Sequence, residues 1–506
     1  MNIRSFRMIL APAVLLFGTA CAELDVTNPN QPDIERALAS PADVVNIASS
    51  SVNSWWLAST HYEPYMMLQV TADAATANFG NFGMRFNNEE PRIAYNNNSS
   101  SGDEQAARRP WTLNYSALGA ANDAGSALTG GIVIPGAAAE GEKVRAAVLL
   151  TQAGVHMNLA LLFDQAFVIT TPPDAANLPV LRPYAEVRDS AMALWTQLIT
   201  LTAGKTWEWD NAWLPTPYPM TASMLNRVAN TMAARTLVLS ARNATQNAAT
   251  NWAQVLAYAN AGITGTGFTD VDFSIVDDGG TNWYDYIKLY GNLDSWTRVD
   301  QRVINRMASN IPVTFNGITN QPVPVPQDNR LVLSNGTCAA NLTSCLVGIT
   351  ADYVYTGRVI GDPGRGLHKQ SPFYHRRWRA SSFAVPDNTG AINVNVLAAE
   401  NDLMIAEAEA RRAGGDLARA AALVNKTYVT RGGRTAVAAS QAAILAAIEY
   451  ERDVELLNTG GISLFDRRRV NGIQNGTFRH LPIPARELEV LGFPIYTFGG
   501  VGLPDM

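Results

Sequence analysis

The sequence predicts a mainly α-helical protein, with a tetratricopeptide-like helical-repeat scaffold and a large, irregular loop-rich region. Apolar residues recur at helical spacing in four separate stretches of the chain. Hydrophobic residues make up 47% of the 506 residues, which is enough apolar material for a sizeable core. The 26 prolines and 38 glycines indicate long ordered loops between helices and argue against a coiled coil.

The N-terminus has the features of an export and anchoring signal. Arg4 and Arg7 precede the apolar run 8–17, which is too short to span a bilayer that needs about 20 residues. Small residues then lead to Cys21. This arrangement resembles a bacterial lipoprotein signal peptide, so we expect residues 1–20 to be removed and Cys21 to carry palmitate-type acyl chains. The alternative is an ordinary secretory signal followed by an incidental cysteine.

The four helical stretches stop at recognisable breaks in the sequence. In the first, Ala146, Leu149, Leu150, Ala153 and Met157 fall on one helix face. An Asn-rich break interrupts the second stretch, the pair Gly414-Gly415 separates the two helices of the third, and the pair Gly460-Gly461 ends the fourth. A single helix pair cannot bury its apolar face, so the pairs must stack on one another. We expect helical pairs near 142–201, 222–263, 396–427 and 440–460.

Two regions without helical period are candidates for a binding surface. The insertion 265–394 is rich in Gly, Asn, Asp, Pro and aromatic residues, and 71–109 has the same character. Loops mounted on a rigid scaffold often carry binding residues.

Aromatic side chains beside polar ones occur in both loop-rich regions. Flat aromatic rings stack on the apolar C–H faces of sugars, whereas amide and carboxylate groups bind sugar hydroxyls. These stretches supply both kinds of group. The alternative for each aromatic residue is core packing, which aromatic residues dominate in most proteins. The candidate ligand-binding residues are Asn282, Trp283, Tyr284, Tyr286 and Trp296 in one stretch, and Phe79, Asn81 and Phe82 in the other.

The remaining cysteines, Cys338 and Cys345, form a close pair in a Gly/Asn/Thr-rich loop. In an exported protein such a pair predicts a local disulfide. Two free thiols are the alternative. A metal site needs more ligands, and no nearby histidine completes a set of four.

Catalytic and cofactor motifs fail at identifiable positions. The segment around Lys205 would need a glycine where Ile199 stands to form a phosphate-binding loop, and no HExxH motif occurs. The best carboxylate cluster, Asp270 to Asp278, is typical of a solvated turn, with a cation site or a glycosidase carboxylate pair as alternatives. We therefore expect no enzyme activity, no catalytic residues, no metal and no cofactor. With 44 acidic and 38 basic residues and no basic stripe, we also expect no nucleic-acid partner.

The basic run Arg467–Arg469 is the most concentrated positive charge near the C-terminus. Such a run could bind an acidic cargo. We expect instead an ion-paired structural role, with Glu451 and Glu455 as candidate partners.

Seven segments spread along the chain resemble motifs of the SusD/RagB family of outer-membrane lipoproteins. Each match is weak by itself, but all seven occur in the family's order. The matching segments are AELDVTNPNQPD (22–33), WTLNYSALGAAN (111–122), HMNLALLFDQAFV (156–168), MLNRVANTMAARTLVLSARN (224–243), NDLMIAEAEARRAGGDLARAAALVN (401–425), YERDVELLNTGGISLFDRRR (450–469) and LPIPARELE (481–489).

The resemblance implies a single SusD-like domain over residues 21–506 with a non-enzymatic binding role. Proteins of this family capture oligosaccharide at the cell surface and deliver it to a SusC-like TonB-dependent transporter in the outer membrane. A peptide cargo is the alternative within the family, and a surface glycosidase is the alternative outside it. Asn458 and Ile462 depart from the family pattern, and 265–394 has no matching motif, which leaves the cargo open.

Overall fold

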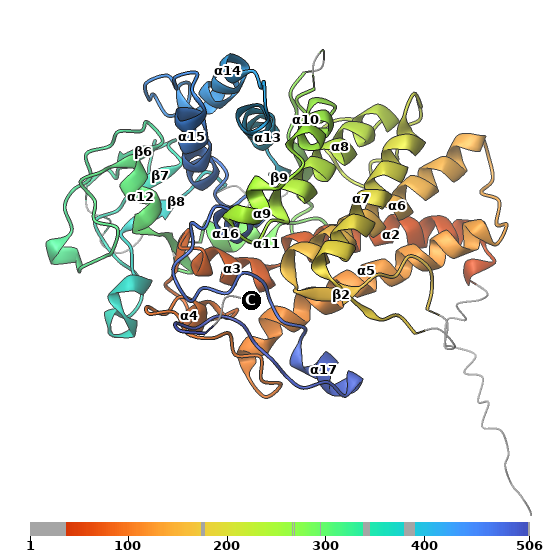
Figure 1. Ribbon diagram of the computed structural model, residues 1–506, viewed down its shortest axis with the longest axis horizontal. Helices are drawn as coiled ribbons and strands as arrows, with labels where there is room; N and C mark the ends of the chain where they lie inside the picture. Colours follow the sequence, from red (N-terminus) through yellow and green to blue (C-terminus); the bar gives the residue numbers. More distant parts are fainter. Residues whose placement is uncertain are drawn as a thin grey trace, which may run out of the picture.

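The computed structural model describes residues 37–173, 178–265, 267, 269–293, 295–336, 338, 345–378 and 390–503. Cys21 and the expected signal peptide lie outside these residues. Figure 1 shows a layer of helices that runs across the molecule, with short strands and long loops on one side. The prediction of a mainly α-helical, helical-repeat fold is confirmed.

The first half of the helical layer contains long helices that lie side by side in Figure 1. Helix α2 begins after Ser40, whose hydroxyl accepts a hydrogen bond from the Asp43 amide, with Pro41 in the first turn. Helix α5 packs on α2 and α6, and α6 packs on α7. The helices are α2 (Pro41–Thr60), α5 (Gln105–Thr129), α6 (Ala138–Leu162) and α7 (Tyr184–Thr202).

The second half of the layer continues the same stacking order. Helix α7 packs on α8, α8 on α10, α10 on α13, α13 on α14 and α14 on α15. Each helix thus contacts its neighbours in turn, which is the arrangement of a repeat protein. These helices are α8 (Ala222–Leu239), α10 (Trp252–Asn260), α13 (Ala398–Arg411), α14 (Leu417–Tyr428) and α15 (Gln441–Val454).

The stretch 440–460 forms one helix, α15, and not the expected pair. The chain turns sharply after it, because Asn458, Gly460 and Gly461 all have positive φ. A Cβ on Gly461 would lie 2.3 Å from Tyr65 Cδ1, and one on Gly460 would lie 2.5 Å from Arg235 Nη2. The paired glycines therefore allow a close approach that no larger residue permits.

Short helices and strands fill the loop-rich side. The three-stranded sheet has the order β6-β7-β8, and the other sheets are the pairs β1-β5, β2-β3 and β4-β9. The strands are β1 (Ala75–Ala77), β2 (Gln165–Phe167), β3 (Leu181–Pro183), β4 (Phe273–Val276), β5 (Thr297–Val299), β6 (Leu331–Leu333), β7 (Tyr353–Tyr355), β8 (Phe373–His375) and β9 (Ile392–Val396). The remaining α-helices of the described chain are α3 (Tyr62–Thr71), α4 (Met84–Asn87), α9 (Ala244–Ala248), α11 (Tyr286–Gly291), α12 (Gln301–Met307), α16 (Ser463–Arg469) and α17 (Ala485–Leu491).

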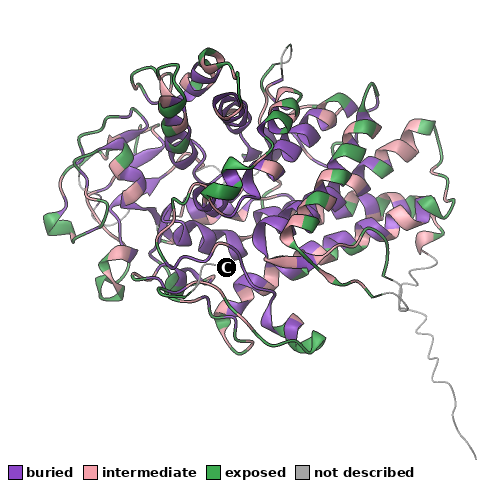
Figure 2. Ribbon diagram, in the orientation of Figure 1, coloured by how far each residue is buried: buried purple, intermediate pink, exposed green. Residues whose placement is uncertain are grey.

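The main hydrophobic core lies between the helices. Buried positions run through the middle of the molecule, and exposed positions collect on outer helix faces and loop tips (Figure 2). Trp55 and Trp56 on α2 are fully buried. Helix α6 passes so close to α2 that a Cβ on Gly154 would lie 2.2 Å from Trp55 Nε1. No helix in the described ranges combines the length and apolar character that a membrane span requires.

Cys338 and Cys345 form a disulfide. Both cysteines are buried in a small apolar cluster with Leu346, Val354 and Tyr374. The bridge thus anchors a loop to strands β7 and β8.

The basic run Arg467–Arg469 is buried and has a structural role. Arg467 Nε lies 2.8 Å from Asp453 Oδ1, and Arg469 Nη1 lies 2.7 Å from Glu407 Oε1. Arg468 donates hydrogen bonds to backbone carbonyl groups. With these partners the guanidinium groups are not available to an acidic cargo.

The expectation that Glu451 and Glu455 bind this run was wrong. Both carboxylates instead contact Arg330, at 2.8 Å and 2.9 Å. Residues four apart lie on the same helix face, so Glu451 and Glu455 point together away from α16, whereas Asp453 points toward it.

Candidate functional site

The two aromatic stretches expected from the sequence meet in one cluster of rings. Helices α4 and α11 both pack on α3 (Figure 1). Strand β1 contacts α3, and strand β5 contacts α11. The aromatic cluster, as it is called below, consists of Tyr62, Phe79, Phe82, Tyr284, Tyr286, Tyr290 and Trp296.

Strand pairing brings the two stretches together. Strands β1 and β5 are antiparallel, and Ala77 pairs with Thr297. Beyond this pair, Trp296 is the next residue on one chain segment and Phe79 is the second residue on the other. The Phe79 amide donates a hydrogen bond to the Trp296 carbonyl at 3.2 Å, which continues the ladder. A pairing of three residues thus fixes the position of both rings.

Trp296 is the centre of one half of the cluster. Its ring centroid lies 4.6 Å from that of Phe79, 5.0 Å from that of Phe82 and 4.6 Å from that of Tyr290. The planes of Trp296 and Phe82 differ by only 12°. Phe79 is 42% exposed, so one edge of this half of the cluster is open to solvent.

Tyr62 connects this half to the tyrosines of α11. Its ring centroid lies 4.1 Å from that of Phe82 and 4.9 Å from that of Tyr286. Tyr284 contacts Tyr286 edge to face at 4.6 Å. All of these tyrosines are partly exposed, and the cluster therefore extends as a row of rings along the surface.

Phe82 has a strained backbone. Its φ is +59°, in the left-handed region that residues with a Cβ rarely adopt. Such strain costs about 1 to 3 kcal/mol and persists only where neighbouring structure holds it. Here the ring is held between Tyr62 and Trp296. The protein thus holds an aromatic side chain at a position where glycine would be less strained.

Three tyrosine hydroxyls of the cluster are held in the neutral form. Burial raises the pKa of Tyr62, Tyr284 and Tyr290, which keeps each phenol protonated. A protonated phenol both donates and accepts hydrogen bonds. Burial, assisted by the charge of Arg109, lowers the pKa of the adjacent His61 to about 4, so this imidazole is also neutral.

Glu63 lies beneath one end of the cluster. Burial raises the pKa of its carboxyl group to about 7, and Arg109 opposes this shift. Arg109 Nε lies 3.7 Å from Glu63 Oε2. The carboxyl group is therefore about half protonated near neutral pH.

Trp283 was expected to bind ligand, but its side chain does not belong to the cluster. Its side chain is only 8% exposed and contacts Trp56 in the main core, with ring centroids 6.4 Å apart. The carbonyl groups of Asn282 and Tyr284 accept hydrogen bonds from Asn53 and Trp56 of α2. These bonds fix the segment on α2 and direct the indole of Trp283 inward. Core packing, the alternative for this residue, is what the structure shows.

Asn81 and Asn282, the two asparagines expected to bind ligand, are exposed. Both are close in sequence to residues of the cluster. Asn81 precedes Phe82, and its carbonyl accepts a hydrogen bond from the Met84 amide. The backbone amide of Asn282 donates hydrogen bonds to the Asp278 carboxylate. Both side chains face solvent.

Tyr62 is the main residue that sequence reasoning missed. It lies outside both loop-rich regions, at the first position of α3. The neighbouring His61 and Tyr65 gave no distinct pattern, and Tyr65 is buried. Its ring contacts with Phe82, Tyr286 and Tyr290 identify Tyr62 as part of the cluster.

The carboxylates of the Asp270–Asp278 segment form hydrogen bonds and an ion pair with other residues of the protein. Asp277 accepts hydrogen bonds from the amides of Gly279 and Gly280, and Asp272 accepts one from Ala398. Asp270 contacts Lys426 at 3.0 Å. Within the described residues, no group of three or more His, Cys, Asp or Glu side chains is placed to hold a metal ion.

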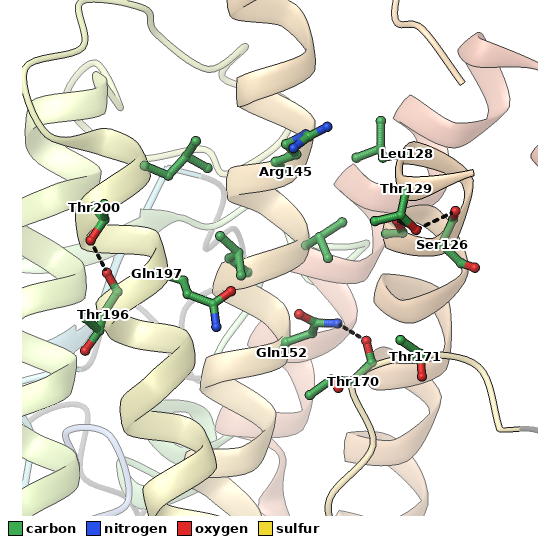
Figure 3. Close-up of a pocket in the computed structure, with 14 residues that line it drawn as sticks. Ser126, Leu128, Thr129, Arg145, Gln152, Thr170, Thr171, Thr196, Gln197 and Thr200 are labelled. Atoms are coloured by element: carbon green, nitrogen blue, oxygen red, sulfur yellow. Dashed lines mark hydrogen bonds between the residues drawn. The ribbon is translucent and has the colours of Figure 1, made fainter. Parts of the chain in front are cut away.

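A separate groove of about 540 Å³ lies on the helical layer between α5, α6 and α7 (Figure 3). Its walls combine apolar side chains such as Leu128 with threonines, and Gln152 donates a hydrogen bond to the Thr170 carbonyl at 3.0 Å. Arg145 lines the groove from α6. None of the residues expected to bind ligand lies here.

The arrangement defines a class of protein: a helical-repeat scaffold that presents a row of aromatic rings on a loop-rich side. No protein-family model matches the chain, and a search of curated proteins found no relative. Solved structures do match it. A SusD superfamily protein from Parabacteroides distasonis has a TM-score of 0.62 at 12% identity, with coverage of 89% of this chain and 98% of that one.

Two further solved structures match at similar levels. A SusD superfamily protein from Bacteroides vulgatus has a TM-score of 0.60 at 14% identity and covers 92% of this chain and 100% of its own. A laminarin-binding SusD-like protein has a TM-score of 0.55 at 14% identity, covering 90% and 98%. The chain therefore has the SusD fold, and the resemblance to the SusD/RagB family is confirmed at the level of the fold.

Proposed function

We propose that this protein is a cell-surface binding lipoprotein that captures an oligosaccharide on the aromatic cluster. The observation that carries the proposal is the row of partly exposed rings from Phe79 to Tyr284, assembled from separate segments. Aromatic faces stack on the apolar faces of sugars, and the tyrosine hydroxyls would bind sugar hydroxyl groups. The SusD fold, which a laminarin-binding protein shares, supports this assignment.

Capture would be followed by delivery to a SusC-like TonB-dependent transporter in the outer membrane. Residues 21–506 would form one SusD-like domain, held at the membrane by acyl chains on Cys21. The stacked helices would contact the transporter and leave the loop-rich side for the cargo. The groove between α5, α6 and α7 lies on these helices and offers an apolar recess for such a contact.

The work of the protein would be binding without chemistry. A surface glycosidase would need two carboxylates across a bound sugar, about 5 to 10 Å apart. Two carboxylates adjoin cluster residues in sequence, and both are buried in ion pairs: Glu63 contacts Arg109, and Asp285 contacts Lys288. This geometry favours a binding role over hydrolysis.

Calorimetry on the chain beginning at Ala22, with panels of oligosaccharides and peptides, tests the proposal. Binding of an oligosaccharide without appearance of shortened products supports it. If only peptides bind, the cargo is a peptide and not an oligosaccharide. If shortened oligosaccharides are released, the protein is a glycosidase. Anchoring is tested separately, because Cys21→Ala should move the protein out of the membrane fraction.

A further inference from the structure

Two arginine side chains converge at the exposed end of the aromatic cluster. A Cβ placed on Gly80 would lie 3.6 Å from Arg85 Cδ and 3.9 Å from Arg365 Nη1. Gly80 itself lies between Phe79 and Asn81. Both guanidinium-bearing side chains therefore flank the loop that carries two rings of the cluster.

Neither arginine is neutralised by the protein. Both side chains are exposed, and no ion pair joins Arg85 or Arg365 to a carboxylate in the described part of the chain. Arg365 Nη1 donates a long hydrogen bond, 3.5 Å, to the carbonyl of Asn78. Most other arginines of this loop-rich side are in ion pairs, for example Arg302 with Glu90 at 2.9 Å. Arg85 and Arg365 thus differ from these arginines because neither has a carboxylate partner among the described residues.

The carboxylates around this end of the cluster have other partners. Asp362, three residues before Arg365, accepts a hydrogen bond from the Gly364 amide at 2.8 Å. Glu89 contacts Lys369, and Asp278 accepts bonds from backbone amides. Glu63 contacts Arg109. Of the charged groups at the Phe79 end, Arg85 and Arg365 are thus two cations that no ion pair offsets in the described part of the chain, in a protein whose net charge is −6.

We propose that the cargo is an acidic oligosaccharide, whose carboxylate or sulfate groups bind Arg85 and Arg365 while its sugar rings stack on Phe79 and Trp296. This inference rests on the proposed function and names the substrate class. A guanidinium group binds carboxylate and sulfate oxygens through paired N–H donors, which gives geometric selectivity as well as attraction. A neutral glycan uses only the rings and hydroxyls.

The test is calorimetry of the purified protein with three probes at low salt: a neutral β-glucan oligosaccharide, a uronate oligosaccharide and a sulfated galactan oligosaccharide. We expect at least one acidic probe to bind more tightly than the neutral one by about tenfold, the value of a hydrogen bond to a charged group. The advantage should shrink at high salt, because ions screen exposed charges. Tighter binding of the uronate probe would identify carboxylate as the acidic group of the cargo, and tighter binding of the sulfated probe would identify sulfate.

The variant Arg85→Gln/Arg365→Gln should abolish the advantage of the acidic probe and leave binding of the neutral probe unchanged. The matched control is Arg145→Gln/Arg486→Gln, which removes the same charge from exposed positions on α6 and α17, outside the cluster. The control should keep the preference. Equal binding of neutral and acidic probes, or a preference that survives the first variant, overturns the inference and leaves the proposed function standing. Failure of every oligosaccharide to bind overturns both.

Discussion

Phe82 and Trp296 stack almost in parallel, with ring centroids 5.0 Å apart and planes that differ by 12°. Their segments are distant in sequence and are joined by the short pairing of β1 with β5. The stack exists only in the folded protein. An intact fold is therefore required for the surface that we propose binds the cargo.

Trp296→Ala should weaken oligosaccharide binding strongly. The indole contacts three other rings of the cluster, so its removal disorders the surface as well as deleting contact area. Loss of a central aromatic contact typically costs about 2 kcal/mol, or about 30-fold in Kd. Phe493→Ala, at an exposed aromatic residue outside the cluster, is the control and should bind normally in the same titration.

Trp283→Ala should reduce stability and not binding. Trp283 is packed in the main core, and truncation of a buried aromatic side chain costs about 3 to 5 kcal/mol. Denaturant unfolding measures this loss. A folded Trp283→Ala protein with normal stability and impaired oligosaccharide binding would place the residue in the site after all.

Phe82→Gly and Phe82→Ala separate backbone strain from ring contacts. Both variants lack the ring, so both should lose affinity for oligosaccharide. Glycine has no Cβ to oppose a φ of +59°, so Phe82→Gly should be more stable than Phe82→Ala by about 1 kcal/mol. Thermal unfolding of the pair provides the comparison, and equal stability would show that the strain is relieved in another way.

Glu407 should make stability depend on acid pH. Burial alone would raise the pKa of its carboxyl group, but Arg469 and Arg452 outweigh burial and lower the pKa to about 2. Because this pKa is below the unfolded value of 4.5, the contribution is complete above pH 4.5 and is lost as pH falls through 2. The shift corresponds to about 3 kcal/mol.

Glu407→Gln tests this linkage. At neutral pH the variant removes one of the two carboxylates that contact the buried Arg469 and leaves only Asp466, and breaking a buried ion pair costs up to about 3 to 5 kcal/mol. As the pH is lowered from 5 toward 2, the wild-type protein loses the same charge, and the two unfolding free energies should converge. A difference that stays constant with pH would mean that Glu407 is not ionised in the native protein.

Local sequence patterns predicted the features that depend on neighbours along the chain. The helical period around Leu149 and Leu150 requires only a buried face, and the positions of α6, α8 and α13 follow from such periods. The spacing of Cys338 and Cys345 allowed a local bridge, which the structure contains.

Features that depend on distant partners were not predictable in this way. Nothing in the sequence pairs Ala77 with Thr297, so the convergence of the two aromatic stretches had no local signal. Trp283 and Tyr284 are adjacent, yet one is buried and the other partly exposed, because α2 binds the backbone carbonyl groups on either side of Trp283. The partners of Arg467 and Arg469 likewise depend on which face of α15 and α13 meets α16.

A crystal structure of the protein with its tightest-binding oligosaccharide would locate the cargo site. We expect sugar rings against Phe79 and Trp296, with tyrosine hydroxyls of the aromatic cluster bonded to sugar hydroxyl groups. An oligosaccharide bound in the groove between α5, α6 and α7, or elsewhere away from the cluster, would contradict this expectation.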